Sequence, residues 1–448
     1  METDFRGMRT NRLLRTACSL AALYLSLCGA SPAQTSGQTV RHHQVAEQDA
    51  SFPPELAEAE AYIEKKDYEL AEPLLKKVVA ANTANYQAWF DLGFVENALG
   101  KTSEAIAAYR TSVAAKPDVF ESNLNLGLML AKTGQPDAEQ FLRAATTLKP
   151  TANVDEGHAR AWLALGHLLE NSKPEEAIES YQHAALLEPQ DPEAHLSAGT
   201  LLEKENRFAD AENEYKEALG IDPGSADALT GLANVYMRGN RFVEASEALQ
   251  KLVKVRPNNA AAHMQLGRLL AASGNDDAAL TELQIAANLE PADFGLQRDL
   301  ADLYSSTKKF DQAESKYRSL LETHPNDAQL HYGLGRVFLK EKKSALAQQE
   351  LLTAVKLKPD FGAAYGDLAV AANENKNYEL AIKAADARAK YLPEIPVSYF
   401  LRATAYDHLR DYKQAAENYH KFLEVAQGEY PDQEWQARHR LIAIEPKK

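Results

Sequence analysis

Residues 87–117 read QAWFDLGFVENALGKTSEAIAAYRTSVAAKP, and the spacing within this stretch decides the fold. Six of its positions return along the chain: Trp89, Leu92, Gly93, Ala105, Tyr109 and Pro117. Gly93 and Ala105 are small enough to let two helices approach closely where they cross, while Leu92 and Tyr109 fill the space beside the crossing. The stretch therefore predicts a helical hairpin whose second helix ends near the proline, which lacks the N–H that a helix needs to continue.

The same positions recur with a period of 34 residues. The prolines that close successive units stand at Pro189, Pro223, Pro257, Pro291, Pro325, Pro359 and Pro393. Alanines early in the second helix keep the same period, for example at Ala177, Ala211, Ala245, Ala279, Ala313, Ala347, Ala381 and Ala415. One hairpin cannot bury its apolar stripe alone, so we expect neighbouring hairpins to stack into a solenoid.

This pattern resembles the tetratricopeptide repeat family over residues 53–428. The resemblance implies an all-α, right-handed superhelical solenoid of about eleven helix-turn-helix hairpins, beginning near residues 53, 86, 120, 159, 192, 226, 260, 294, 328, 362 and 396. An extra stretch at residues 151–158 (TANVDEGH) is expected to be an inserted loop between two hairpins. Residues 429–448 are predicted to form a capping helix that covers the apolar end of the stack with Trp435, Ala437, Leu441 and Ile442.

The first 33 residues differ in kind from the rest. Four arginines precede an apolar run at residues 16–30, and small residues follow up to Ala33, which is the pattern of a secretory signal peptide. Cleavage at Ala33 would place the mature chain in the periplasm or outside the cell, without a membrane span. The alternatives are an uncleaved signal that serves as an anchor, or lipidation of Cys28. Residues 34–52 are polar and aperiodic, and we expect a flexible tether there.

Composition and charge bound the function. The chain is 45% hydrophobic and 25% charged, as folded soluble proteins are. Removal of residues 1–33 takes away four of the 49 basic and two of the 64 acidic residues, so the mature net charge is −17. A surface this acidic repels phosphate backbones, and nucleic acid is not an expected partner. Both cysteines, Cys18 and Cys28, lie in the segment removed, so the mature chain has no thiol chemistry.

No stretch of the sequence matches a catalytic or cofactor-binding motif. HExxH, GxxxxGK[ST], GxSxG and a glycine-rich dinucleotide turn are all missing from the printed sequence. His195, His263 and His331 occupy one position in alternate repeats, too far apart to share a metal ion, and we interpret them as half-buried helix residues. We therefore expect no enzyme activity, no cofactor and no metal.

The family resemblance implies that the first helices line a concave groove that holds a partner segment. On that face the candidate partner-binding residues are Asn234, Met264, Arg268, Arg298, Asp302, Tyr332 and Arg336. The three arginines would suit an acidic protein or peptide, because guanidinium groups pair bidentately with carboxylates. The competing interpretation is that each arginine pairs with a neighbouring Asp or Glu of the chain itself. Towards the N-terminus, Phe90 and Phe94 are expected to pack against the next hairpin.

The resemblance and the predicted export together favour a non-catalytic scaffold or adaptor of the cell envelope that binds another protein. A self-associating structural protein, in which a second copy occupies the groove, is the first alternative. A polysaccharide-binding solenoid of an export system is the second alternative. The sequence does not name the partner.

Overall fold

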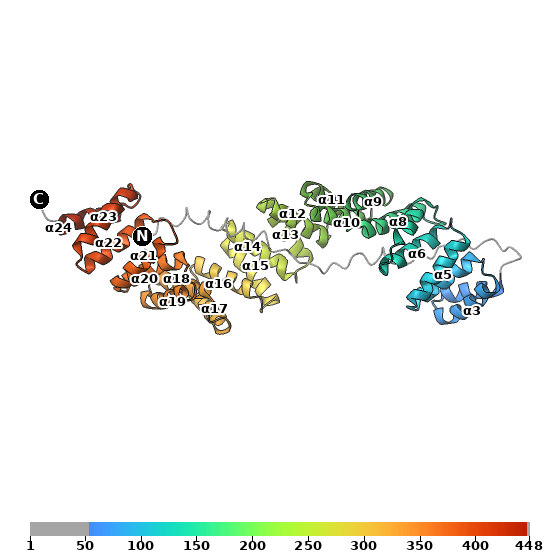
Figure 1. Ribbon diagram of the computed structural model, residues 1–448, viewed down its shortest axis with the longest axis horizontal. Helices are drawn as coiled ribbons and strands as arrows, with labels where there is room; N and C mark the ends of the chain where they lie inside the picture. Colours follow the sequence, from blue (N-terminus) through green and yellow to red (C-terminus); the bar gives the residue numbers. More distant parts are fainter. Residues whose placement is uncertain (1–52, 446–448) are drawn as a thin grey trace. The chain divides into compact units, whose positions relative to one another are not determined.

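The computed structural model describes residues 53–445, which are helical and contain no β-strand within that range. The 23 helices of this range pair in chain order into eleven hairpins and one last helix, which confirms the predicted all-α hairpin solenoid (Figure 1). They divide into two compact units, residues 53–257 and residues 258–445. The predicted signal peptide (1–33) and tether (34–52) lie outside the described residues.

The N-terminal unit contains six hairpins. Its helices are α2 (Pro54–Glu64), α3 (Tyr68–Ala81), α4 (Tyr86–Ala98), α5 (Thr102–Ala115), α6 (Phe120–Lys132), α7 (Ala138–Thr147), α8 (Val154–Leu169), α9 (Pro174–Leu187), α10 (Glu193–Lys204), α11 (Phe208–Ile221), α12 (Ala226–Arg238) and α13 (Phe242–Val255).

The C-terminal unit contains five hairpins and the last helix. Its helices are α14 (Ala260–Ala272), α15 (Asp276–Leu289), α16 (Phe294–Ser306), α17 (Phe310–Thr323), α18 (Ala328–Lys340), α19 (Ser344–Leu357), α20 (Gly362–Glu374), α21 (Tyr378–Ala389), α22 (Pro396–His408), α23 (Tyr412–Ala426) and α24 (Pro431–Ile444).

In several hairpins a large side chain of the second helix packs against a glycine of the first helix. Tyr109 is fully buried, and a Cβ atom added to Gly93 would lie only 2.9 Å from its ring. Leu351 takes the same place against Gly335, where an added Cβ atom would lie 2.7 Å from the leucine. The close approach predicted from the small residues is therefore what holds the two helices of a hairpin together.

Helix ends follow the period as closely as the core does. Helix α13 ends at Val255, two residues before Pro257, and α19 ends at Leu357, two residues before Pro359. Between the helices of most hairpins one residue has positive φ, for example Asn240 at 56° and Gly274 at 81°. This left-handed residue reverses the chain after the first helix, and glycine and asparagine adopt such a conformation most easily.

The extra stretch at residues 151–158 is a loop only over residues 151–153, so the prediction of a loop over the whole stretch was wrong. Helix α8 begins at Val154, so most of the insertion lengthens the first helix of the fourth hairpin. Asp155 and Glu156 lie in its first turn, where the positive end of the helix dipole favours acidic side chains. Thr151, at the start of the stretch, is bound to α6, because its backbone N–H and its hydroxyl both donate to Glu121, at 2.9 and 2.7 Å.

Helix α24 caps the stack with only one of its faces. Ala437 and Leu441 are buried with Phe422 of α23 in one apolar cluster. The exposed fractions of Trp435 and Ile442 are 61% and 72%, so the prediction that they cover the end of the stack was wrong. Trp435 and Ile442 lie two helical turns apart on the face opposite Ala437, and a helix can turn only one face to its neighbour.

Within residues 53–445, no helix combines the length and the apolar composition that a membrane span requires.

Candidate functional site

Six of the seven predicted partner-binding residues lie on three successive first helices of the C-terminal unit. These are Met264 and Arg268 on α14, Arg298 and Asp302 on α16, and Tyr332 and Arg336 on α18. Asn234 lies on α12 in the N-terminal unit, so it is not brought together with the other six within one unit. We call the first-helix face formed by these six residues the C-terminal face.

Two of the three arginines on the C-terminal face are already paired within the chain. Arg268 forms an ion pair with Asp299 of the next first helix at 2.6 Å, and its side chain is largely buried. Arg336 pairs in the same way with Asp367 at 3.6 Å, and its guanidinium lies over the ring of Tyr332. For these two residues the structure shows the competing interpretation, in which an arginine pairs with a neighbouring carboxylate of its own chain.

The third arginine is different. Within residues 53–445, the half-buried Arg298 forms no hydrogen bond or ion pair. One turn further along α16, Asp302 is exposed and accepts a hydrogen bond from the hydroxyl of Tyr317. Desolvation by the surrounding helices raises the pKa of Asp302, and the Tyr317 hydrogen bond opposes this shift without cancelling it. Arg298 and Asp302 thus remain available to a ligand between two neutralised Arg–Asp pairs.

The histidines of alternate repeats have a structural role. Each pairs with a glutamate of the second helix in its own hairpin: His195 with Glu214 at 2.7 Å, His263 with Glu282 at 2.6 Å and His331 with Glu350 at 2.7 Å. The described residues contain no group of three or more His, Cys, Asp or Glu side chains placed to hold a metal ion. The interpretation as partly buried helix residues fits these pairs, and His263 is buried outright.

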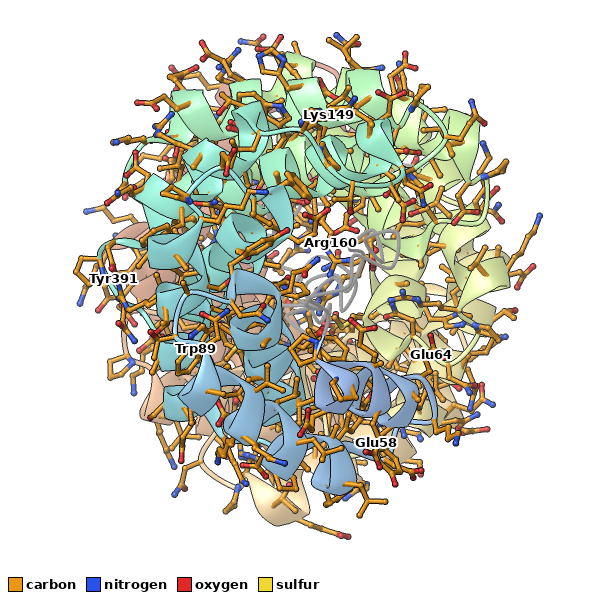
Figure 2. The ribbon with its side chains drawn as sticks, turned by 90° about the vertical axis from the view of Figure 1, so that its right-hand side faces the viewer. Glu58, Glu64, Trp89, Lys149, Arg160 and Tyr391 are labelled. Carbon is orange, nitrogen blue, oxygen red and sulfur yellow. The ribbon has the colours of Figure 1, made fainter. Side chains whose placement is uncertain are left out.

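The N-terminal unit contains a second polar cluster, on α8 and α10, that our sequence analysis did not identify. Its members are Arg160, His167 and Glu170 on or next to α8, and Glu193 at the start of α10. Arg160 lies toward the inner side of this unit in Figure 2. Arg160 and Glu170 share a helix face with Leu163 and His167, so inspection of every position on that face of α8 would have found them.

His167 is the centre of this cluster. Its Nδ1 atom lies 2.8 Å from the hydroxyl of Tyr181, which in turn donates to Glu170 at 2.5 Å. Its Nε2 atom lies 3.9 Å from Glu193. Burial alone would lower the pKa of His167, but the hydrogen bond to Glu170 and the negative charges of Glu170 and Glu193 outweigh it and raise the pKa to about 9. The imidazole is therefore protonated at neutral pH.

This protonation predicts a pH dependence of stability. A histidine whose pKa rises from 6.5 to about 9 on folding stabilises the folded state below pH 6.5, and this contribution is lost as the pH rises through 9. We expect the N-terminal unit to lose up to about 3 kcal/mol of unfolding free energy over this range relative to His167→Gln. Urea titrations of both proteins between pH 6 and pH 9.5 measure the difference, and parallel pH profiles would contradict the assignment.

Family comparisons agree with the repeat architecture. A tetratricopeptide repeat family model matches more than half of the chain, at residues 56–119, 96–153, 167–226, 298–347 and 342–396. Two further tetratricopeptide repeat models match residues 202–264 and 396–428.

Individual proteins match more loosely. The BBSome complex member bbs-4 of Caenorhabditis elegans is 32% identical over 135 residues, which are 30% of this chain and 27% of that protein. The chain thus spans about a quarter of that relative's length. Among solved structures, the tetratricopeptide repeat protein YrrB, described as having an unusual peptide-binding site, is 24% identical with a TM-score of 0.40, over 42% of this chain and 96% of YrrB. The Cut9–Hcn1 assembly of the APC/C is 15% identical with a TM-score of 0.41, over 87% of this chain and 97% of that one. The repeat matches show that this chain belongs to the tetratricopeptide repeat family.

Proposed function

We propose that this chain is a non-catalytic scaffold of the cell envelope that binds a protein partner through its first helices. Members of the tetratricopeptide repeat family bind protein partners, and the eleven stacked hairpins leave no segment of residues 53–445 for a separate catalytic domain. Export to the periplasm or beyond rests on the signal-peptide pattern of residues 1–33. The partner segment is proposed to lie along the C-terminal face.

The observation that carries this proposal is the state of the polar groups on α16. Arg268 and Arg336 form ion pairs with Asp299 and Asp367, so their positive charges are already balanced within the chain. Arg298 keeps its hydrogen-bonding capacity, and Asp302 is exposed beside it. A face with one free guanidinium and one exposed carboxylate suits a peptide that offers both acceptors and donors.

A crosslinking pull-down from envelope extracts of the source cells tests this proposal. The intact chain is compared with Arg298→Glu, and Lys356→Glu serves as the control because it makes the same charge change at an exposed residue of the second helix α19. We expect a captured protein that is lost with Arg298→Glu and kept with Lys356→Glu. Reversal of Arg268 or Arg336 is avoided, because it would break an ion pair with Asp299 or Asp367 that joins two hairpins. Equal capture by both variants would contradict the proposed face.

Self-association is the second candidate, and the exposed apolar face of α24 favours it. Trp435 and Ile442 leave more than half of their surfaces open to solvent on one side of the last helix. Sedimentation equilibrium decides between the candidates. A concentration-dependent oligomer that Trp435→Glu returns to a monomer would support self-association, and a monomer at every concentration would support the scaffold.

A further inference from the structure

Arg160 on α8 carries a charge that the chain itself does not satisfy. Its Nε and Nη2 atoms are buried and have no hydrogen-bond partner among the described residues, although part of the side chain reaches solvent. Burial lowers the pKa of Arg160, and the nearby charges of Glu156 and Glu193 only partly offset that shift. A guanidinium that is partly dehydrated and not hydrogen-bonded is destabilised relative to a paired one.

The positions of Nε and Nη2 of Arg160 indicate which kind of chemical group would complete their hydrogen bonds. Nε and Nη2 lie on the same edge of the planar guanidinium, and their N–H bonds point in parallel. This edge matches the two oxygens of a carboxylate, which accept both hydrogen bonds at once. No hydrogen bond fixes Arg160 in place, so a small rotation of its long side chain can present this edge to a ligand.

His167 extends the same site. It lies two helical turns beyond Arg160 on the same face of α8, it is protonated at neutral pH, and its buried Nε2 atom has no hydrogen-bond partner among the described residues. Glu193 is the carboxylate of the chain that acts on both groups. It lies 3.9 Å from His167 Nε2, beyond hydrogen-bond distance, and accepts no hydrogen bond from Arg160 Nε or Nη2. Glu193 therefore attracts both cations without completing their hydrogen bonds.

Other enclosed arginines of the chain show what a completed site looks like. Arg402 is 7% exposed, and it donates to Asp386 and Glu394 at 2.7 Å and to the carbonyl of Ala385 at 3.1 Å. Arg268 donates to Asp299 at 2.6 Å, although its Nη1 atom is buried without a hydrogen-bond partner among the described residues. Arg160 has no such partner in residues 53–445, which separates it from arginines that hold the hairpins together.

We propose that Arg160 anchors a carboxylate of the bound protein partner through its Nε and Nη2 atoms, with Glu193 as an internal competitor. This site rests on the proposed scaffold function and adds a second contact in the N-terminal unit, separate from Arg298. The carboxylate belongs either to the C-terminus of the partner or to an Asp or Glu side chain. Both sources present the same two oxygens to the guanidinium edge.

Binding of peptide pools to the full chain tests this anchor. Three hexapeptide pools are compared: one with free C-termini and no Asp or Glu, one amidated with Asp and Glu, and one amidated without them. The variants are Arg160→Gln, Glu193→Gln and, as a control, Arg207→Gln, whose arginine is an exposed residue just before α11 and pairs with Glu175 and Asp210. Circular dichroism and thermal melting confirm that each variant is folded.

We expect the intact chain to retain one or both carboxylate pools and to bind them at least tenfold more tightly than the neutral pool. Arg160→Gln is expected to weaken that binding by about tenfold, equivalent to about 1.4 kcal/mol. Glu193→Gln is expected to strengthen it by about threefold, because it removes the competing charge, and Arg207→Gln should leave it unchanged. Retention of the first pool identifies a C-terminal carboxylate, and retention of the second identifies an acidic side chain.

Several results would overturn the anchor. Unchanged binding with Arg160→Gln, equal binding of the neutral pool, or weaker binding with Glu193→Gln would each show that Arg160 does not hold a carboxylate. A partner that is still captured by Arg160→Gln and lost with Arg298→Glu would leave the scaffold function intact and refute only the anchor. Capture of no partner by the intact chain, together with no retained pool, would refute both.

Discussion

Replacement of Tyr317 by alanine is expected to lower the unfolding free energy of the C-terminal unit by about 3–5 kcal/mol. Tyr317 is 1% exposed, and its ring packs so closely on Gly333 of the next hairpin that an added Cβ atom would lie 2.5 Å from it. Its hydroxyl donates to Asp302. The substitution therefore opens a cavity between two hairpins and removes the hydrogen bond that Asp302 accepts.

Tyr412→Ala is the matched control for this prediction, because Tyr412 is 44% exposed at the start of α23. We expect the control to change stability by less than about 1 kcal/mol. Hydrogen exchange followed by mass spectrometry measures the effect, and faster exchange should centre on α16, α17 and α18 because each hairpin contacts mainly its neighbours. Unchanged exchange in these helices would show that Tyr317 does not couple the hairpins.

Replacement of Gly231 by leucine is expected to cost about 3 kcal/mol in the N-terminal unit. A Cβ atom at this position of α12 would lie 2.6 Å from Cε1 of Tyr215 and closer still to Cζ. Tyr215 cannot easily move away, because it is 3% exposed and its hydroxyl donates to Glu203 at 3.1 Å. Leucine would therefore push α12 away from α11, the helix before it.

Gly220→Leu tests whether the cost comes from the collision or merely from losing a glycine. Gly220 lies within α11, and no atom lies within 4 Å of the position that its Cβ would take. Leucine favours helix over glycine by about 0.5–1 kcal/mol, so the control is expected to raise stability slightly. Urea unfolding of both variants gives the comparison. Equal effects of the two substitutions would contradict the close packing of Gly231 on Tyr215.

The architecture could be predicted from the sequence because one contact is repeated many times. Gly93 with Tyr109 and Gly335 with Leu351 are the same crossing, and a period of 34 residues leaves few other ways to bury these side chains. The predictions that were wrong concern places where the period stops. The stretch before α8 could lengthen a helix or form a loop, and α24 could turn either of two apolar faces inward. In both places the contacts with neighbouring helices, rather than the repeat pattern of the sequence, determine the conformation.

The candidate site was predictable only in part. The sequence placed Arg268, Arg298 and Arg336 on one face, because position on a helix follows from the period. It did not show that Asp299 and Asp367 neutralise two of these arginines, because each pair joins two hairpins and depends on how they stack. Arg160 was missed for a related reason, since enclosure of its Nε and Nη2 atoms without a partner is a property of the packed helices.

The hairpin and the number of repeats could be predicted from the sequence, because they depend on contacts within about one repeat. Which charged side chains are paired could be learned only from the stacked hairpins, because those pairs join different repeats. Ion pairs and hydrogen bonds act over short distances, so a carboxylate balances the charge of an arginine of another hairpin only when stacking brings the two groups within about 4 Å.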